Sequence, residues 1–167
     1  MQIIGYVDSN FATNVDNRKS VTGYITTFGG MILNWSSKNQ PMVTLSSTEA
    51  EYVALATSAQ DILFDQQLLD ELTTKQEKPS LLYEDNTGAI FLAKNSQVSG
   101  RTKHIDTRHH FIRQLIQEKR LEVTFVRSAE NYADLLTKNL PEKQFATHVA
   151  ALQQGSLDGW RKDVATG

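Results

Sequence analysis

The sequence predicts one α/β domain built around a mixed β-sheet. Three short segments rich in apolar and β-branched residues follow one another near the N-terminus with only turns between them, which predicts antiparallel pairing. A long helical segment separates them from two further strand-like segments, and a crossover of that length permits parallel pairing. The 167 residues include 40% hydrophobic and 22% charged side chains, which is the composition of an ordinary globular domain.

The three N-terminal strands are predicted from residue types and turn signals. The second segment is rich in Val, Thr, Ile, Tyr and Phe, which favour strands. Gly29 and Gly30 then predict the turn into the third segment, and a polar loop separates the first segment from the second. We expect strands at residues 3–8, 20–28 and 31–36.

A long helix is predicted after the third strand. Ser46 and Glu49 have the spacing of a capping box, which marks a helix start. Phe64, Leu68 and Leu72 recur at i, i+4 and i+8, so they form an apolar stripe along one side. The helix is expected to end before residues 75–80.

The second half of the chain predicts two strands and four helices. Asn131 is expected to cap the third of these helices, and Pro141 to open the fourth, which fades before Gly155. Residues 155–167 are expected to form a flexible tail, so the domain is predicted to span residues 1–154. The expected strands are residues 81–85 and 121–126, and the first three helices are residues 87–94, 105–119 and 131–138.

Composition narrows the classes of function. The absence of cysteine excludes a disulfide scaffold, a zinc ribbon and thiol catalysis, so a metal would be held by oxygen or imidazole. The net charge of −2 argues against indiscriminate binding to nucleic acid, but residues 94–120 are basic. This basic segment suits contact with a phosphate backbone, or it is a solvated helix face. No apolar run approaches the length of a membrane span.

Four carboxylates are the candidate functional residues. Asp8, Glu51, Asp85 and Asp134 each lie where an apolar segment meets a polar one. Carboxylate oxygens are the ligands that Mg²⁺ and Mn²⁺ prefer, and a two-metal site needs several of them from different elements. Asp8 and Asp85 are expected at strand ends, where ligands of α/β sheets bind. The spacing therefore predicts a metal-dependent nuclease.

Each acid also has a simpler interpretation. Asp8 and Asp85 could be turn residues at strand ends, and Asp134 could favour a helix dipole. On the helix, Glu49 is placed to complete the capping box, which leaves Glu51 as the acid free to face the sheet. The joint placement of the four acids favours the functional interpretation over these alternatives, since uncompensated acids at one edge would repel each other.

Seven motifs give the chain a family resemblance. They span residues 3–145 and occur in this order: GYVDSNFA, DNRKSVTGY, WSSKNQP, SSTEAEYVAL, YEDNTGAI, RTKHIDTRHHF and SAENYADLLTKNLP. The chain resembles the ribonuclease H domain of copia-type long-terminal-repeat retrotransposon polyproteins. The resemblance implies a ribonuclease H-like fold, with a five-stranded mixed sheet of three antiparallel strands and then two parallel ones, and helices on both faces.

The resemblance also implies an activity and a cofactor. The family's metal-binding acids fall on Asp8, Glu51, Asp85 and Asp134, with Asp8 the expected bridge between two Mg²⁺ ions, for which Mn²⁺ can substitute. The implied reaction is hydrolysis of the RNA strand of RNA–DNA hybrids during reverse transcription. The implied partners are the hybrid and the reverse transcriptase domain of the same polyprotein, inside an intracellular, cytoplasmic virus-like particle. We expect the isolated domain to be a monomer without membrane contact.

Substrate contacts are predicted from the same resemblance and from charge. Small polar residues near the site would read the minor groove and the 2′ hydroxyls, and basic residues would follow the DNA phosphates. All of them could equally be caps, turns or solvated side chains. The minor-groove candidates are Ser9, Ser47, Thr48 and Asn86, and the phosphate candidates are Lys38, Arg101 and Lys103.

The chain departs from the wider pattern in ways that leave alternatives open. Residues 127–130 lack the histidine that many ribonucleases H have before the last aspartate. His104, His109 and His110 could suggest zinc, but their spacing favours local pairs of His104 or His110 with Asp106. A catalytically weak domain that tethers a hybrid beside a reverse transcriptase is the alternative function, and another nuclease or an integrase of the same fold is a third.

Overall fold

The computed structural model describes residues 2–72, 76–95 and 103–155, the first four residues of the last range by their backbone alone. Its sheet has the strand order β3-β2-β1-β4-β5, with β1 antiparallel to β2, β2 antiparallel to β3, and β4 parallel to both β1 and β5. This confirms the predicted mixed sheet. The strands are β1 (Ile3–Asn10), β2 (Val21–Phe28), β3 (Met31–Asn39), β4 (Ser80–Glu84) and β5 (Leu121–Phe125).

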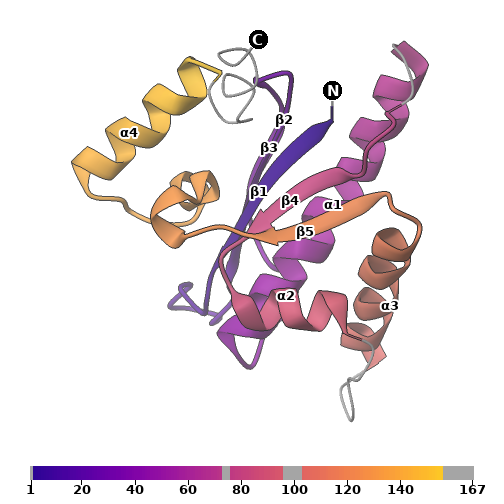
Figure 1. The fold of residues 1–167 in the computed structure, drawn as a ribbon. Helices are drawn as coiled ribbons and strands as arrows, with labels where there is room; N and C mark the ends of the chain where they lie inside the picture. The colour runs from indigo at the N-terminus through magenta and orange to yellow at the C-terminus, as the bar shows by residue number, and fades with distance from the viewer. Residues whose placement is uncertain (1, 73–75, 96–102, 156–167) are drawn as a thin grey trace.

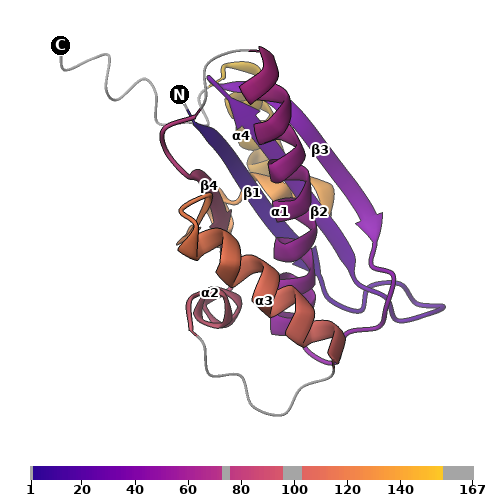
Figure 2. The same cartoon turned by 90° about the vertical axis from the view of Figure 1, so that its right-hand side faces the viewer.

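Helices cover both faces of this sheet (Figure 1). One face carries α1 (Ser47–Leu72), α2 (Thr87–Lys94) and α3 (Lys103–Gln117), and α1 runs along the strands of the antiparallel half (Figure 2). The other face carries a 3₁₀ turn, η2 (Tyr132–Leu136), and α4 (Glu142–Gln153), which follow a shorter turn, η1 (Ser128–Glu130). None of the described helices is long and apolar enough to cross a membrane.

The pleat of β1 divides the core in two. Ile3 and Val7 pack toward α1, whereas Ile4 and Tyr6 pack toward η2 and α4. This is the alternation that a strand buried on both faces requires, because successive side chains point to opposite sides. Asp8 continues the series of Ile4 and Tyr6, so the alternation directs it toward η2.

The long helix buries a different face from the predicted one. Phe64, Leu68 and Leu72 are 62%, 42% and 70% exposed, so the predicted stripe faces away from the sheet. The buried side instead includes Leu55 and Ile62, which belong to the main core. Apolar residues recur at helical spacing on both sides of α1, and only the position of the sheet decides which side is buried.

Local signals at the ends of elements were predicted well. Ser46 accepts a hydrogen bond from the amide of Glu49, as predicted. Glu49 completes the cap by accepting from the amide of Leu45. Asn86 caps α2, the alternative that the sequence left open for it, and its side chain accepts a hydrogen bond from the amide of Ala89. Among the differences, β1 and β3 run further than expected, and the short helix after Asn131 is a 3₁₀ turn. Of the predicted tail, residues 155–167, all but Gly155 lie outside the described residues.

Candidate metal centre

Asp8 lies inside β1 and not at its end as predicted, because β1 continues to pair with β2 through Asn10. Its partner across the ladder is Gly23. A Cβ at Gly23 would lie 2.5 Å from Cγ2 of Thr137 and 2.9 Å from Cβ of Leu136. Glycine at this position therefore lets the segment after η2 lie directly on the sheet beside Asp8.

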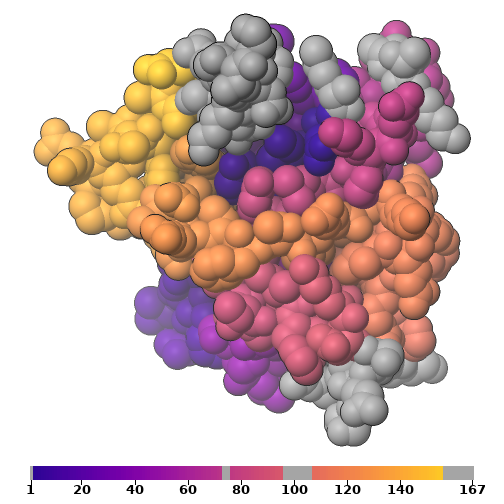
Figure 3. All heavy atoms as spheres, viewed as in Figure 1, coloured from indigo at the N-terminus to yellow at the C-terminus, as the bar shows by residue number. Residues whose placement is uncertain are grey.

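Hydrogen bonds fix that segment in place. Asn131, fully buried, donates from Nδ2 to the carbonyl of Val7 at 2.9 Å and accepts at Oδ1 from the amide of Ala133. At the other end, Asn10 donates to the carbonyl of Thr137 at 2.9 Å. Because both anchors adjoin Asp8, they hold Asp134 at a defined position against β1. In Figure 3 the segment from β5 to η2 crosses the middle of the visible face.

Three of the four predicted acids converge here. Carboxylate oxygens of Asp8, Asp85 and Asp134 lie within 4.8 Å of one another, although the residues come from β1, the end of β4 and η2. Asp8 and Asp134 are buried, and Asp85 is partly exposed. The geometry matches the predicted convergence and leaves one side open to solvent at Asp85.

A lysine lies between two of these acids. Lys138 donates from Nζ to Oδ1 of Asp8 at 2.9 Å and to Oδ1 of Asp134 at 2.8 Å. The hydroxyl of Thr137 donates to the other oxygen of Asp8. Neither residue was predicted as part of the site, although the spacing of Asp134 and Lys138 is that of a helical ion pair.

Glu51, the fourth predicted acid, belongs to an adjoining group. Its carboxylate lies within 4.8 Å of those of Glu84 and Asp85. Glu84 was not predicted as a site residue. Its signal was in the alternation of β4, where Ser80, Leu82 and Glu84 are the buried positions and Leu82 packs in the core under α1. Glu84 consequently lies on the same side of the sheet as Glu51.

Burial raises the pKa values of three of these acids. Burial, and then the charges of Asp8 and Asp85, raise the pKa of Glu51 to about 9. Burial also raises the pKa of Asp8 to about 6, although Thr137 and Lys138 act against it. For Glu84, burial and then the charge of Glu51 hold the pKa well above its ordinary range. A cation bound among these carboxylates would favour their ionised form and so lower their pKa values.

The ammonium of Lys138 responds in the opposite sense. Burial lowers its pKa, but the hydrogen bonds to Asp134 and Asp8 outweigh burial and raise the pKa above the ordinary value of lysine. Lys138 therefore carries a full positive charge at neutral pH.

The residues fit a hard divalent cation. All donors in the two groups are carboxylate oxygens, which suit Mg²⁺ or Mn²⁺ and exclude soft metals. Oε2 of Glu51 and Oε2 of Glu84 are buried without a hydrogen-bond partner in the part of the chain that the structure describes. Asp85 belongs to both groups, whereas the family resemblance implies Asp8 as the shared ligand.

Among the described residues, the groups that could hold a metal contain no histidine. His109 is buried on α3, with its ring centroid 4.1 Å from that of Tyr52. The side chains of His104 and Asp106 lie outside the described part, so their predicted pairing stays a prediction.

The predicted minor-groove residues lie close to the acids in the chain. Ser9 is buried, and its hydroxyl has no partner in the described structure. Ser47 and Thr48 form the first turn of α1, and Thr48 lies beside Gly88 of α2. Asn86 uses its side-chain oxygen as the α2 cap.

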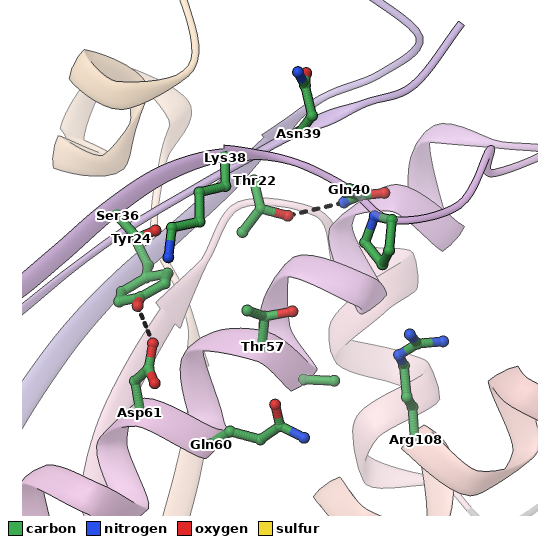
Figure 4. A pocket seen from close by; sticks show the side chains of 12 residues that line it. Thr22, Tyr24, Ser36, Lys38, Asn39, Gln40, Thr57, Gln60, Asp61 and Arg108 are labelled. Atoms are coloured by element: carbon green, nitrogen blue, oxygen red, sulfur yellow. Dashed lines mark hydrogen bonds between the residues drawn. The ribbon is translucent and has the colours of Figure 1, made fainter. Parts of the chain in front are cut away.

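Of the predicted phosphate contacts, only Lys38 can be placed. Arg101 lies outside the described residues, and Lys103 is described by its backbone alone. Lys38 lines a pocket of about 310 Å³ between β3, α1 and α3, together with Arg108 (Figure 4). Gln40 adjoins this pocket and donates to the carbonyl of Ala50, the residue before Glu51. On α1 the pocket is lined by Ala56, Thr57, Gln60 and Asp61.

The strand order and the helices on both faces define the ribonuclease H-like fold, as comparison with solved structures confirms. LC11-RNase H1, isolated from compost, superposes with a TM-score of 0.60 at 19% identity, covering 89% of this chain and 98% of that one. The same enzyme in complex with an RNA/DNA hybrid gives 0.59 at 18% identity, covering 81% of this chain and 94% of that one. A prototype foamy virus protease–reverse transcriptase gives 0.54 at 14% identity, covering 93% of this chain and 21% of that one.

Sequence comparison then identifies the family. The chain is 44% identical over 141 residues, 84% of its length, to the retrovirus-related Pol polyprotein from transposon TNT 1-94 of Nicotiana tabacum. It is 37% identical over 87% of its length to that from transposon RE1 of Arabidopsis thaliana. The chain belongs to the family of copia-type retrotransposon Pol polyproteins, and it corresponds to their ribonuclease H-like region. It spans 10% of the length of these relatives. No family model matches the chain.

Proposed function

We propose that this domain is a metal-dependent endonuclease that hydrolyses the RNA strand of RNA–DNA hybrids during reverse transcription. The observation that carries the proposal is the convergence of Asp8, Asp85 and Asp134 from three separate elements within 4.8 Å, with Glu51 adjoining. Such a cluster is unfavourable without a cation, a role that Lys138 fills for Asp8 and Asp134 in this structure, and its donors suit Mg²⁺. The fold and the family supply the context in which this chemistry is expected.

The positions of the acids suggest which of them would hold each metal ion. Asp8, Asp85 and Asp134 would hold one ion, and Glu51 with Asp85 would hold another. When bound, the pair would lower the pKa of an attacking water and stabilise the leaving 3′ oxygen. Asp8 is fixed by Thr137 and by the pairing of β1, so its carboxylate is oriented before substrate arrives. Lys138 neutralises Asp8 and Asp134 until then.

The pocket of Figure 4 suggests where the DNA strand would contact the protein. Lys38 and Arg108 line it from β3 and α3, and a phosphate is the ligand that two such cations favour. Ser9, Ser47, Thr48 and Asn86 remain the proposed contacts to the minor groove. The reverse transcriptase part of the polyprotein is the proposed partner that supplies the hybrid.

The proposal is tested with end-labelled RNA–DNA hybrid, RNA duplex and DNA duplex, in Mg²⁺, in Mn²⁺ and in chelator. The purified domain should cut only the RNA of the hybrid and only with metal. Asp85→Asn should abolish cutting, whereas Asp70→Asn, on the exposed side of α1, should not change it. Hybrid binding without cutting would contradict the proposal and favour the tethering alternative.

A further inference from the structure

Glu84 is a fifth acid at this site, and its environment calls for an explanation. It is fully buried, at the end of β4 beside Asp85. One oxygen, Oε1, accepts a hydrogen bond from the amide of Asn86 at 2.9 Å. The other, Oε2, has no partner among the described residues. A buried carboxylate oxygen without a partner is costly unless it is protonated, paired or bound to a metal.

The carboxylate of Glu84 lies close to two others. Oxygens of Glu51, Glu84 and Asp85 lie within 4.8 Å of one another, and Oε2 of Glu51 is buried without a partner as well. Two acids on different elements, one from α1 and one from β4, thus lie close together, and each has a buried oxygen without a partner among the described residues. A purely structural position under α1 would favour an apolar residue, so two buried acids at this place point to a ligand.

A lysine balances the negative charge of Asp8 and Asp134, whereas no described ion pair balances the charge of Glu51 and Glu84. Asp8 and Asp134 share the ammonium of Lys138 at 2.9 and 2.8 Å. Within residues 2–72, 76–95 and 103–155, neither Glu51 nor Glu84 has an ion pair. The site therefore has a protein cation on the Asp8 side and three acids without one on the Glu51 side.

We propose that Glu84 is a metal ligand, and that Glu51, Glu84 and Asp85 hold a divalent cation beside the one held by Asp8, Asp85 and Asp134. This rests on the proposed function, because it assigns a ligand to the same metal centre. Asp85 is the carboxylate that the two positions share. The cation would be Mg²⁺ or Mn²⁺, since three carboxylates within this spacing offer only hard oxygen donors.

The test measures binding of Mn²⁺ alone by titration calorimetry, with the melting temperature in chelator and in Mn²⁺. Glu84→Gln preserves the shape and the acceptor for the Asn86 amide but removes the anionic ligand. It should weaken one Mn²⁺ binding event by about tenfold or more and reduce the gain in melting temperature on adding Mn²⁺. In chelator it should melt no lower than wild type, which establishes that it folds. Glu84→Asp should retain more binding than Glu84→Gln.

The matched control is Glu122→Gln on β5, the strand next to β4, where the glutamate is exposed. It should bind Mn²⁺ as wild type does. Equal Mn²⁺ binding by Glu84→Gln and wild type would overturn the inference and identify Glu84 as a protonated structural acid, even if both proteins cut the hybrid. Binding of Mn²⁺ that depends on Glu84 in a domain that cuts no hybrid would support the inference and overturn the nuclease proposal.

Discussion

At the scale of single residues, the site depends on how buried charge is balanced. Asp8 is fully buried between a hydroxyl from Thr137 and an ammonium from Lys138. Both partners come from the segment that also carries Asp134. The same partners must yield to an incoming metal ion, so the metal-free and metal-bound states compete for the same oxygens.

Replacing Lys138 separates these two states. Lys138→Met should lower the stability of the metal-free protein by about 1–2 kcal/mol, less than for a fully buried pair because Lys138 is 35% exposed. The same change should tighten Mn²⁺ binding by about tenfold, since a competing cation is removed. Denaturant unfolding in chelator and calorimetric titration measure the two effects. Lys143→Met, on exposed α4, is the control, and weaker Mn²⁺ binding by Lys138→Met would contradict the account.

The raised pKa values predict an unusual dependence on pH. Neutral Asp8 and Glu51 are favoured in the folded, metal-free protein, so the stability they contribute is fully present below about pH 4. It is lost as pH rises through about 6 for Asp8 and about 9 for Glu51. The melting temperature in chelator should therefore fall as pH rises, whereas the increase caused by Mg²⁺ should grow. A chelator profile that is flat in wild type and in Glu51→Gln alike would contradict this.

At the scale of elements, the turn η2 positions Asp134, Lys138 follows directly after it, and hydrogen bonds at both ends anchor this segment to β1. Asn131 contributes both a cap and a bond to the carbonyl of Val7. Asn131→Ala should cost about 1–3 kcal/mol, because it leaves buried backbone groups unpaired, and should reduce cleavage by displacing Asp134. Gln67→Ala, on the exposed side of α1, should change neither. Full activity in Asn131→Ala would show that η2 is positioned by other contacts.

The two sides of α1 give a second prediction at this scale. Phe64 is 62% exposed and Ile62, two residues earlier, is 1% exposed. Phe64→Ser should change stability by less than about 0.5 kcal/mol, whereas Ile62→Ala should cost about 2–5 kcal/mol by leaving a cavity in the core. Chemical denaturation of the two variants decides the matter. A larger cost for Phe64→Ser would mean that the predicted apolar stripe packs against protein after all.

At the scale of the whole molecule, the sequence predicts what depends on neighbours in the chain. The bounds of α2 at Thr87–Lys94 matched the prediction because Asn86 caps the helix locally. The meander and the crossover likewise follow from segment order. Contacts across the fold could not be predicted in the same way. The bond from Lys138 to Asp8 joins residues 130 positions apart, and the burial of Glu84 depends on α1 lying over β4.

The central claim is that the carboxylates of β1, β4, α1 and η2 form one metal centre. The most direct test is a crystal structure of the domain with Mn²⁺, read from the anomalous scattering of the ion. We expect one peak coordinated by Asp8, Asp85 and Asp134, with Lys138 displaced from Asp8, and a second peak beside Glu51, Glu84 and Asp85. Clear density for Lys138 still bound to both aspartates, and no anomalous peak at saturating Mn²⁺, would contradict it.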